Sequence, residues 1–323
     1  MFENMNKMRA WTMAARLRTL PLAVTCVLLG AALAQSSGLG PKAQHQFTVV
    51  VAGAMLTVIL LQVLANFAND YGDYKKGTDT AAGRQDRALA SGLLAPQSMK
   101  QAMGITAVLA FATGIATLCL SFVPAFGAQE TGTEAMWMAL LGTLGTFGII
   151  AAIRYTVGTQ SYGYKGFGDV YVMLFFGFVG VLGVGLLVAH EWHGIWTLPA
   201  LFSGCMSVAV LNLNNLRDHV KDAESGKRTM VVQLGFEGGK RYHLLLLAVG
   251  WSSLAVFFHA PSQVDRWHGT MWYVLIALVH ARHAVQVWQC KDPALLDPEL
   301  KRVALSSFLV ALFMFMDQTV VPT

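Results

Sequence analysis

Residues 55–79 read MLTVILLQVLANFANDYGDYKKGTD, an apolar run that ends in a cluster of amides and carboxylates. The apolar part continues upstream and is long enough to cross a bilayer, which takes a helix of about 20 residues. Over the 323 residues, 55% are hydrophobic and only 13% are charged, whereas soluble globular proteins carry about 25% charged residues. This composition excludes a disordered chain, a nucleic-acid-binding protein and an ordinary soluble α/β enzyme. It predicts an all-α polytopic protein whose main solvent is lipid.

The apolar segments and the basic residues together predict a topology. Nine segments are long enough, or nearly so, to span a membrane, and their centres are Leu28, Ile59, Thr113, Thr143, Val179, Met206, Gly250, Ile276 and Leu312. The segments near Met206 and Ile276 are the most polar, which leaves a count of eight open. Twenty Lys and Arg residues lie at the N-terminus and in alternate loops, against two in the remaining loops. The positive-inside rule therefore places the N-terminus and the long polar loops in the cytoplasm.

A second acidic cluster, LNLNNLRDHVKD at residues 211–222, follows the sixth apolar segment. On a helix each cluster forms a stripe, because residues four and seven or eight apart share a face. Both clusters end helices that run inward, where the helix dipole disfavours carboxylates and stacked carboxylates repel one another. Carboxylate and amide oxygens of this kind are typical ligands of Mg²⁺. The alternative interpretation is that the two acidic clusters are only solvated helix ends. The expected metal ligands are Asn66, Asp70, Asp73, Asn214, Asp218 and Asp222.

The two clusters form a weak internal repeat. We expect one domain over residues 1–323, with two pseudo-repeated halves, roughly 1–155 and 156–323, facing one cavity. Two acidic faces that hold Mg²⁺ suit a diphosphate group, whose departure the metal assists. Basic residues beside the clusters either hold the same anion or only signal topology; they include Lys75, Lys76, Arg84, Lys227 and Arg228.

Further stretches extend the pattern: RLRTLP at residues 16–21, YTVG at 155–158, YGYKGFGD at 162–169 and GKRT at 226–229. With the acidic clusters they resemble the UbiA superfamily of intramembrane aromatic prenyltransferases, and within it the 1,4-dihydroxy-2-naphthoate polyprenyltransferases of menaquinone synthesis. The resemblance implies nine transmembrane helices around a central cavity, in the bacterial inner membrane with a cytoplasmic active site. It also implies Mg²⁺-dependent transfer of a polyprenyl group from its diphosphate to the naphthoate, with loss of CO₂ and diphosphate, giving demethylmenaquinone.

The resemblance also suggests roles for individual residues. Asp70, Asp73, Asp218 and Asp222 would act in catalysis through the metal, and the residues expected to hold the diphosphate are Lys76, Arg154, Lys165, Lys227 and Arg228. Aromatic faces stabilise a cationic intermediate, so we expect Tyr155 and Tyr164 beside the breaking C–O bond. An interfacial aromatic belt is the alternative for these tyrosines.

Some positions depart from the family pattern. Tyr74 stands where the generic first motif has its last Asp, which leaves Asp73 and Asp79 as substitutes. Thr159 stands where some relatives have a lysine, and this favours a naphthoate over a 4-hydroxybenzoate acceptor. Arg84 and Arg87 match the naphthoate enzymes only loosely.

Other interpretations stay open at this point. Another aromatic acceptor, such as 4-hydroxybenzoate, is the first. A secondary transporter is the second, although transporters hold their charged residues near the membrane midplane. His280 and His283, in the eighth segment, are interpreted as packed residues near a helix end rather than as metal ligands.

Overall fold

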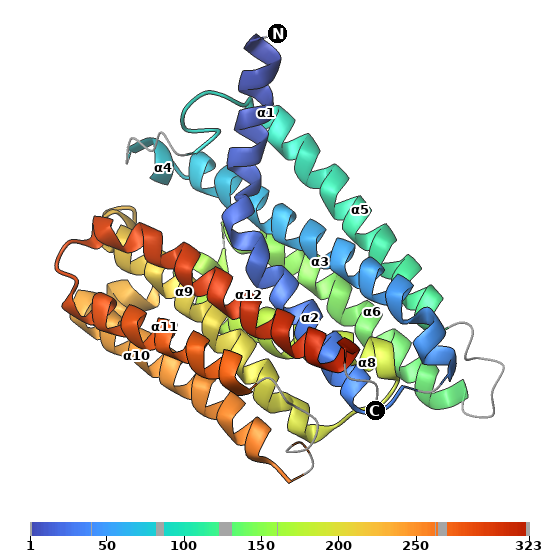
Figure 1. Ribbon diagram of the computed structural model, residues 1–323. Coiled ribbons are helices and arrows are strands. Elements are labelled where there is room, and N and C mark those ends of the chain that lie inside the picture. Colours follow the sequence, from blue (N-terminus) through green and yellow to red (C-terminus); the bar gives the residue numbers. More distant parts are fainter. Residues whose placement is uncertain are drawn as a thin grey trace.

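The computed structural model describes residues 2–39, 41–81, 87–122, 131–159, 161–261, 263 and 270–320. All regular structure in these ranges is helical (Figure 1). The long helices are α1 (Phe2–Ala15), α2 (Leu20–Ser36), α3 (Pro41–Lys75), α5 (Pro96–Phe122), α6 (Thr131–Arg154), α9 (Thr197–Glu224), α10 (Met230–His259), α11 (Thr270–Gln289) and α12 (Asp297–Val320). Shorter helical segments are η1 (Leu17–Thr19), α4 (Thr78–Ala81), η3 (Tyr162–Lys165), α7 (Gly168–Val172), η4 (Met173–Leu182), α8 (Gly183–Ala189), η5 (Gly194–Trp196) and η7 (Pro293–Leu296).

The prediction of an all-α chain with several membrane-crossing segments is confirmed. In the described ranges, seven segments are long and apolar enough to span a bilayer, and the first of them combines part of α1 with η1 and α2. The segments expected around Ile276 and Leu312 are also helical, as α11 and α12, but are not among those seven. Nine spans and a cytoplasmic N-terminus therefore stay predictions.

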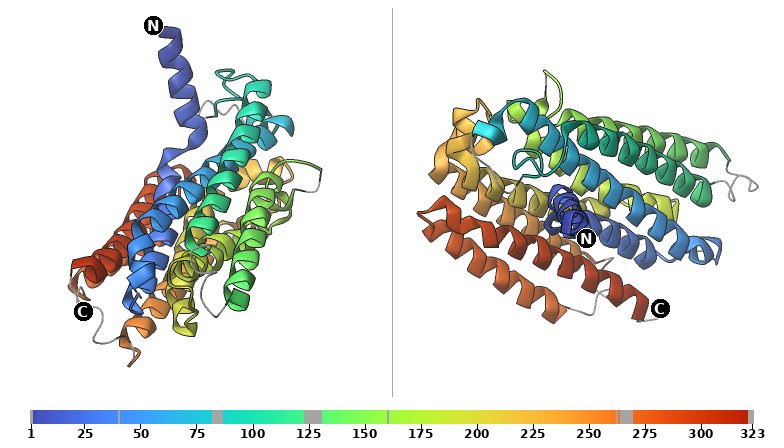
Figure 2. Two further views of the ribbon diagram at one scale, coloured as in Figure 1. Left: turned by 90° about the vertical axis from the view of Figure 1, so that its right-hand side faces the viewer. Right: turned by 90° about the horizontal axis from the view of Figure 1, so that it is seen from above.

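The helices form two groups joined by α2. Helices α9 to α12 pack together on one side, while α3, α5 and α6 lie on the other (Figure 1). Helix α1 stands out from this bundle (Figure 2, left). The helical conformation is interrupted between α1 and α2 at Arg16, whose φ of 48° is in the left-handed region. Non-glycine residues rarely adopt this region, and such strain is often kept at functional sites.

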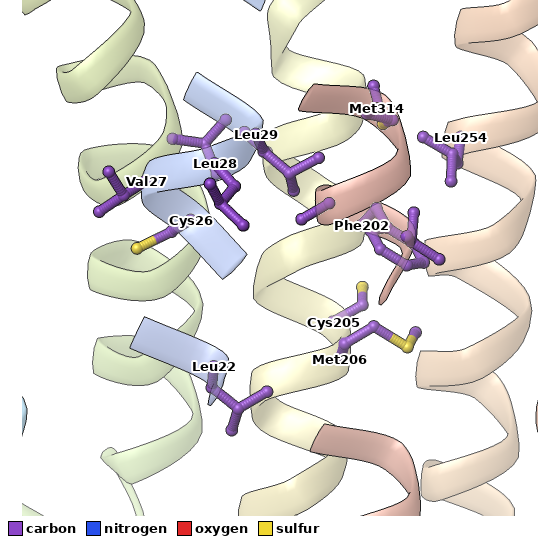
Figure 3. Close-up of a cluster of buried hydrophobic side chains, with 14 of the residues drawn as sticks. Leu22, Cys26, Val27, Leu28, Leu29, Phe202, Cys205, Met206, Leu254 and Met314 are labelled. Atoms are coloured by element: carbon purple, nitrogen blue, oxygen red, sulfur yellow. The ribbon is translucent and has the colours of Figure 1, made fainter. Parts of the chain in front are cut away.

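The largest apolar core joins α2 to the α9–α12 group. Figure 3 shows Leu29 of α2 near Phe202 of α9, Leu254 of α10 and Met314 of α12, all of them buried. A Cβ atom on Gly30 would lie 2.5 Å from the Val181 carbonyl oxygen. Only glycine therefore allows α2 to pack this closely against η4, as small residues do between membrane helices.

Helix α3 carries the first acidic cluster at its end. With 35 residues it is about 50 Å long, longer than the hydrocarbon core of a bilayer. A Cβ atom on Gly72 would lie 2.7 Å from backbone atoms of Thr156, and the Thr156 hydroxyl donates to the Ala68 carbonyl at 2.7 Å. This close contact holds the connection after α6 against the acidic end of α3.

Candidate functional site

A cavity of about 420 Å³ lies between α2, α3, α5, α6, η4 and α9. The polar end is formed by the ends of α3 and α9 and the segments after them, with Arg16, Asn66, Asn69, Asp73, Thr78, Asp79, Arg87, Tyr155, Tyr164, Asn214, Asp218, Lys221, Asp222 and Lys227 in its wall. Apolar residues line the rest, among them Leu61, Ala110, Leu118, Leu141, Gly145, Phe175, Val179 and Leu187. The cavity thus offers charged groups to one end of a ligand and hydrocarbon to the other.

The first acidic cluster turns a different stripe to this cavity than the sequence analysis expected. Asn66, Asn69 and Asp73 line the cavity, whereas Asp70 does not. Asp70 is only 1% exposed, and its electrostatic partners are Arg16 first, then the backbone of Leu89, Asp73 and the backbone of Ala88. Successive residues on a helix point about 100° apart. When Asn69 and Asp73 line the cavity, Asp70 therefore lies on the side of α3 next to the 87–94 segment, outside the cavity wall.

Asn66 is held through its amide nitrogen, whereas the atom with which an asparagine binds a metal is its amide oxygen. Its amide nitrogen donates to the Ala15 carbonyl at 2.8 Å and to the Thr19 hydroxyl at 3.2 Å. These bonds tie α3 to the break between α1 and α2. Asn66 lines the cavity, but its amide nitrogen also holds Arg16 and its neighbours in place.

The second acidic cluster has the expected arrangement. Asn214, Asp218 and Asp222 all line the cavity from α9. Arg217 binds both oxygens of Asp218, with Nε 2.9 Å from Oδ1 and Nη2 2.8 Å from Oδ2. Such a two-pronged pair fixes the plane of a carboxylate more firmly than a single hydrogen bond does.

The two clusters meet at Lys227. Its ammonium group donates to Asp73 at 3.1 Å and lies 3.8 Å from Asp222. Asp79, buried just after α3, also lines the cavity and lies 3.6 Å from Arg87 Nε. The ends of α3 and α9 therefore face a common space. The alternative interpretation, two separately solvated helix ends, does not describe this arrangement.

Tyr164 connects these charged groups. Its hydroxyl donates to Asp73 at 2.7 Å, and it lies 2.8 Å from the Thr78 hydroxyl. The ammonium groups of Lys76 and Lys227 lie 3.6 and 4.9 Å from its ring centre, within reach of a cation–π interaction. Burial, followed by the negative charge of Asp73, raises the pKa of Tyr164. The phenol therefore keeps its proton and stays a hydrogen-bond donor.

Lys76 does not line the cavity itself and donates to the Ser161 hydroxyl. Burial lowers the pKa of Lys76, and the nearby charge of Lys227 adds to this effect while Asp73 opposes it. The ammonium group thus belongs to the same charge cluster as Lys227, one step behind the cavity wall.

Tyr155 begins a row of aromatic rings along the cavity wall. Tyr162 meets it edge-on at 5.4 Å and stacks on Tyr171 at 3.8 Å, with Phe175 further along. Burial raises the pKa of Tyr155, and nearby carboxylates, Asp169 first, add to the shift. These rings supply a neutral aromatic surface next to the acidic clusters.

Three expected diphosphate ligands lie elsewhere. Arg154, Lys165 and Arg228 are exposed and do not line the cavity. Arg84 lies outside the described residues. Arg16, Asn69 and Lys221 line the cavity instead, although the sequence analysis did not select them. The signal for Asn69 was present, because it stands four residues before Asp73 just as Asn214 stands before Asp218.

The donor set suits a hard divalent cation. In the described part of the chain, no three His, Cys, Asp or Glu residues converge closely enough to hold a metal alone. Mg²⁺ commonly takes only one or two carboxylates and completes its shell with water and substrate phosphates. Asp73, Asp79, Asp218 and Asp222 can provide such partial ligand sets from both sides of the cavity.

The histidines of α11 belong to a separate buried network. His283 lies between His243 of α10, at 2.8 Å, and Glu299 of α12, at 2.5 Å. His280 accepts from Trp251 Nε1 at 2.8 Å. The sequence analysis did not foresee the carboxylate next to His283, because Glu299 comes from another helix. The interpretation as packed residues agrees with this arrangement.

Comparisons with known proteins match nearly the whole chain. The model of the UbiA prenyltransferase family matches residues 23–302. The 1,4-dihydroxy-2-naphthoate octaprenyltransferase of Haemophilus influenzae is 36% identical over 94% of both chains, and that of Escherichia coli is 37% identical over 98% of both. The structure of a UbiA homolog from Archaeoglobus fulgidus bound to DMAPP and Mg²⁺ has a TM-score of 0.59 at 17% identity, over 95% of this chain and all of that one. At this identity the last comparison shows a common fold.

Proposed function

Because this chain belongs to the UbiA prenyltransferase family, we propose that it transfers a polyprenyl group from a polyprenyl diphosphate to 1,4-dihydroxy-2-naphthoate. Diphosphate and CO₂ leave, and the product is a prenylated 1,4-naphthalenediol, the reduced form of demethylmenaquinone. The contact of Lys227 with both Asp73 and Asp222 carries the proposal most directly, because it joins the two acidic clusters at the polar end of a long apolar cavity.

Asp73 and Asp79 from one side, and Asp218 and Asp222 from the other, would hold Mg²⁺ together with the diphosphate. When bound, the metal supplies positive charge to the leaving phosphate oxygens. Lys227 lies close enough to exchange its carboxylate partners for the same anion. Arg16, Arg87 and Lys221 are the other basic groups at this end of the cavity, and Lys76 lies behind Tyr164.

The tyrosines would stabilise charge on the substrate. Departure of diphosphate leaves positive charge on the allylic carbon, and the faces of Tyr155 and Tyr164 can stabilise it without forming a bond. The naphthoate ring then attacks through the carbon that bears its carboxylate. The new C–C bond replaces the bond to CO₂, so the electron pair of that bond returns to the ring and no ring proton has to be removed.

The rest of the chain would hold the lipid substrate in the membrane. The apolar walls from α3, α5, α6 and η4 suit an isoprenoid tail. We further propose one domain over residues 1–323 with two facing pseudo-repeated halves, since each half contributes one acidic cluster. The bacterial cytoplasmic membrane, with the polar end of the cavity toward the cytoplasm, is the location that the distribution of basic residues supports.

The test uses the purified full-length protein in detergent with octaprenyl diphosphate, Mg²⁺ and two competing acceptors, 1,4-dihydroxy-2-naphthoate and 4-hydroxybenzoate. We expect pyrophosphate release and, by mass spectrometry, a prenylated naphthalenediol that lacks the carboxylate. Removing Mg²⁺ with a chelator should stop both, and Asp218→Ala should do the same in a folded protein. A prenylated benzoate as the main product would overturn the acceptor, while solute flux without any chemistry would favour a transporter.

A further inference from the structure

A row of alternating charges leads from the start of α12 to the second acidic cluster. Arg18 of η1 lies 3.2 Å from Asp297, the first residue of α12. Asp297 also accepts a hydrogen bond from Arg217 Nη1. Arg217 in turn binds both oxygens of Asp218 through Nε and Nη2. Residues distant in the sequence thus converge on one cavity carboxylate.

Arg217 does not line the cavity, in contrast to Arg16 and Lys227. A guanidinium group is planar and presents its N–H donors in fixed directions. With two nitrogens on Asp218 and the third on Asp297, its orientation is determined from both ends. The side chains of Arg217 and Asp218 are only 13% and 17% exposed, so water competes little for this pair.

From this geometry we propose that Asp297 is a positioning residue for Asp218, and that it acts through Arg217. Each carboxylate oxygen has two lone pairs, and Arg217 uses one on each oxygen of Asp218. The same carboxylate lines the cavity, so a divalent cation bound there would lie beside it. Asp297 keeps the guanidinium on the outer side of Asp218, so that the carboxylate presents a constant face to the cation. This inference rests on the proposed function.

The same contacts connect the two acidic clusters. Arg18 is followed by Thr19, whose hydroxyl accepts from Asn66 of α3 at 3.2 Å. The break between α1 and α2 therefore touches the first cluster through Thr19 and the second through Arg18 and Asp297. A role in stability alone is the competing explanation, and a metal-binding measurement separates the two.

The test measures Mn²⁺ binding to the full-length protein in detergent by electron paramagnetic resonance, without substrate. Removing groups that orient a metal ligand typically weakens metal binding 10- to 100-fold. Asp297 is one residue further away and half-exposed, so we expect Asp297→Asn to raise the Kd for Mn²⁺ about 3- to 10-fold. The KM for the prenyl diphosphate should rise similarly, and kcat should stay within about twofold. Asp297→Glu, which keeps the charge, should recover most of the affinity.

Asp292 provides the matched control. It lies five residues before Asp297, in the connection between α11 and α12, and caps η7 by accepting from the Ala294 amide at 3.0 Å. Asp292→Asn should leave the Kd for Mn²⁺ and the KM unchanged. If Asp297→Asn lowers the melting temperature but binds Mn²⁺ like the wild type, Asp297 has a structural role only and the inference is overturned. A wild-type protein that neither binds Mn²⁺ nor releases pyrophosphate overturns the proposed function and this inference together.

Discussion

Lys227 and Asp73 are separated by 154 residues, yet the lysine ammonium lies 3.1 Å from the carboxylate. Asp73 ends one acidic helix, and Lys227 follows the other. The same ammonium is 3.8 Å from Asp222. Because Asp73 and Asp222 are both buried, Lys227 offsets the repulsion that two facing carboxylates would otherwise create.

This contact predicts that Lys227 stabilises the metal-free protein. Removing one partner of a buried ion pair leaves the other charge uncompensated, at a cost of about 3 kcal/mol. Lys227→Met should therefore lower the melting temperature in a chelator. Added Mg²⁺ should restore much of the loss, because a divalent cation can neutralise the same carboxylates. Thermal unfolding followed by intrinsic fluorescence measures both.

The control for Lys227 is Lys165→Met, which removes an exposed lysine that does not line the cavity. It should unfold like the wild type in both conditions. Equal melting temperatures for Lys227→Met and the wild type in the chelator would show that the contact does not stabilise the protein.

Two neighbouring carboxylates on α3 should behave differently. Asp73→Asn should lower pyrophosphate release at least about 100-fold, because a charge that assists diphosphate departure is lost. Asp70→Asn should retain turnover within about tenfold and mainly lower thermal stability, because Asp70 does not line the cavity and acts on it only through the nearby charge of Arg16. If folded Asp70→Asn is as inactive as Asp73→Asn, the stripe expected from the sequence is the functional one.

The Tyr164 hydroxyl should contribute as a neutral donor. Its pKa is raised above the ordinary value of 10.0, so deprotonation moves to higher pH and the phenol is protonated throughout the working range. A hydrogen bond to a charged group contributes about 1.5–3 kcal/mol, so Tyr164→Phe should lower kcat/KM about 10- to 100-fold. The shape of the pH–rate profile should not change below pH 10.

An alkaline limb near pH 8–9 that disappears in Tyr164→Phe would contradict this assignment. Tyr74→Phe is the matched control, because Tyr74 is the tyrosine next to Asp73 on α3 and does not line the cavity. Its kcat/KM should stay close to the wild-type value.

The open space beside Gly145 should determine how long a prenyl chain the cavity accepts. It lines the apolar part of the cavity, and a Cβ atom there meets nothing within 4 Å. Gly145→Leu should therefore fill space without a clash and lower turnover of octaprenyl diphosphate more than that of geranyl diphosphate. Gly104→Leu, at an equally open position outside the cavity, should affect neither substrate. An equal loss with both substrates in Gly145→Leu would show that this wall does not contact the distal part of the chain.

The membrane character and the chemistry of the site could be predicted from local sequence. Long apolar runs determine helices that cross a bilayer, since only such segments satisfy their backbone hydrogen bonds in lipid. Carboxylates and amides at helical spacing indicate an oxygen-rich cation site on each of two helices. Both inferences use only residues that are close together in the sequence, so the spacing of residue types is enough to make them.

The stripe that faces the cavity could not be predicted in the same way. Asn66, Asp70 and Asp73 form a stripe on α3, but Asn69 and Asp73 do so equally well, because residues three and four apart share a helix face. The packing of α3 against α5, α6 and the 87–94 segment determines the rotation of the helix and turns Asp70 away from the cavity.

The sequence alone therefore determined that this is a helical membrane protein with two acidic clusters suited to Mg²⁺ and diphosphate, because apolar length and helical spacing are local properties. Tertiary structure decided that Lys227 joins Asp73 to Asp222, that Arg217 lies between Asp218 and Asp297, and that Arg154, Lys165 and Arg228 face away from the cavity. Each of these depends on how distant helices rotate and pack against one another, which no spacing within a single helix records.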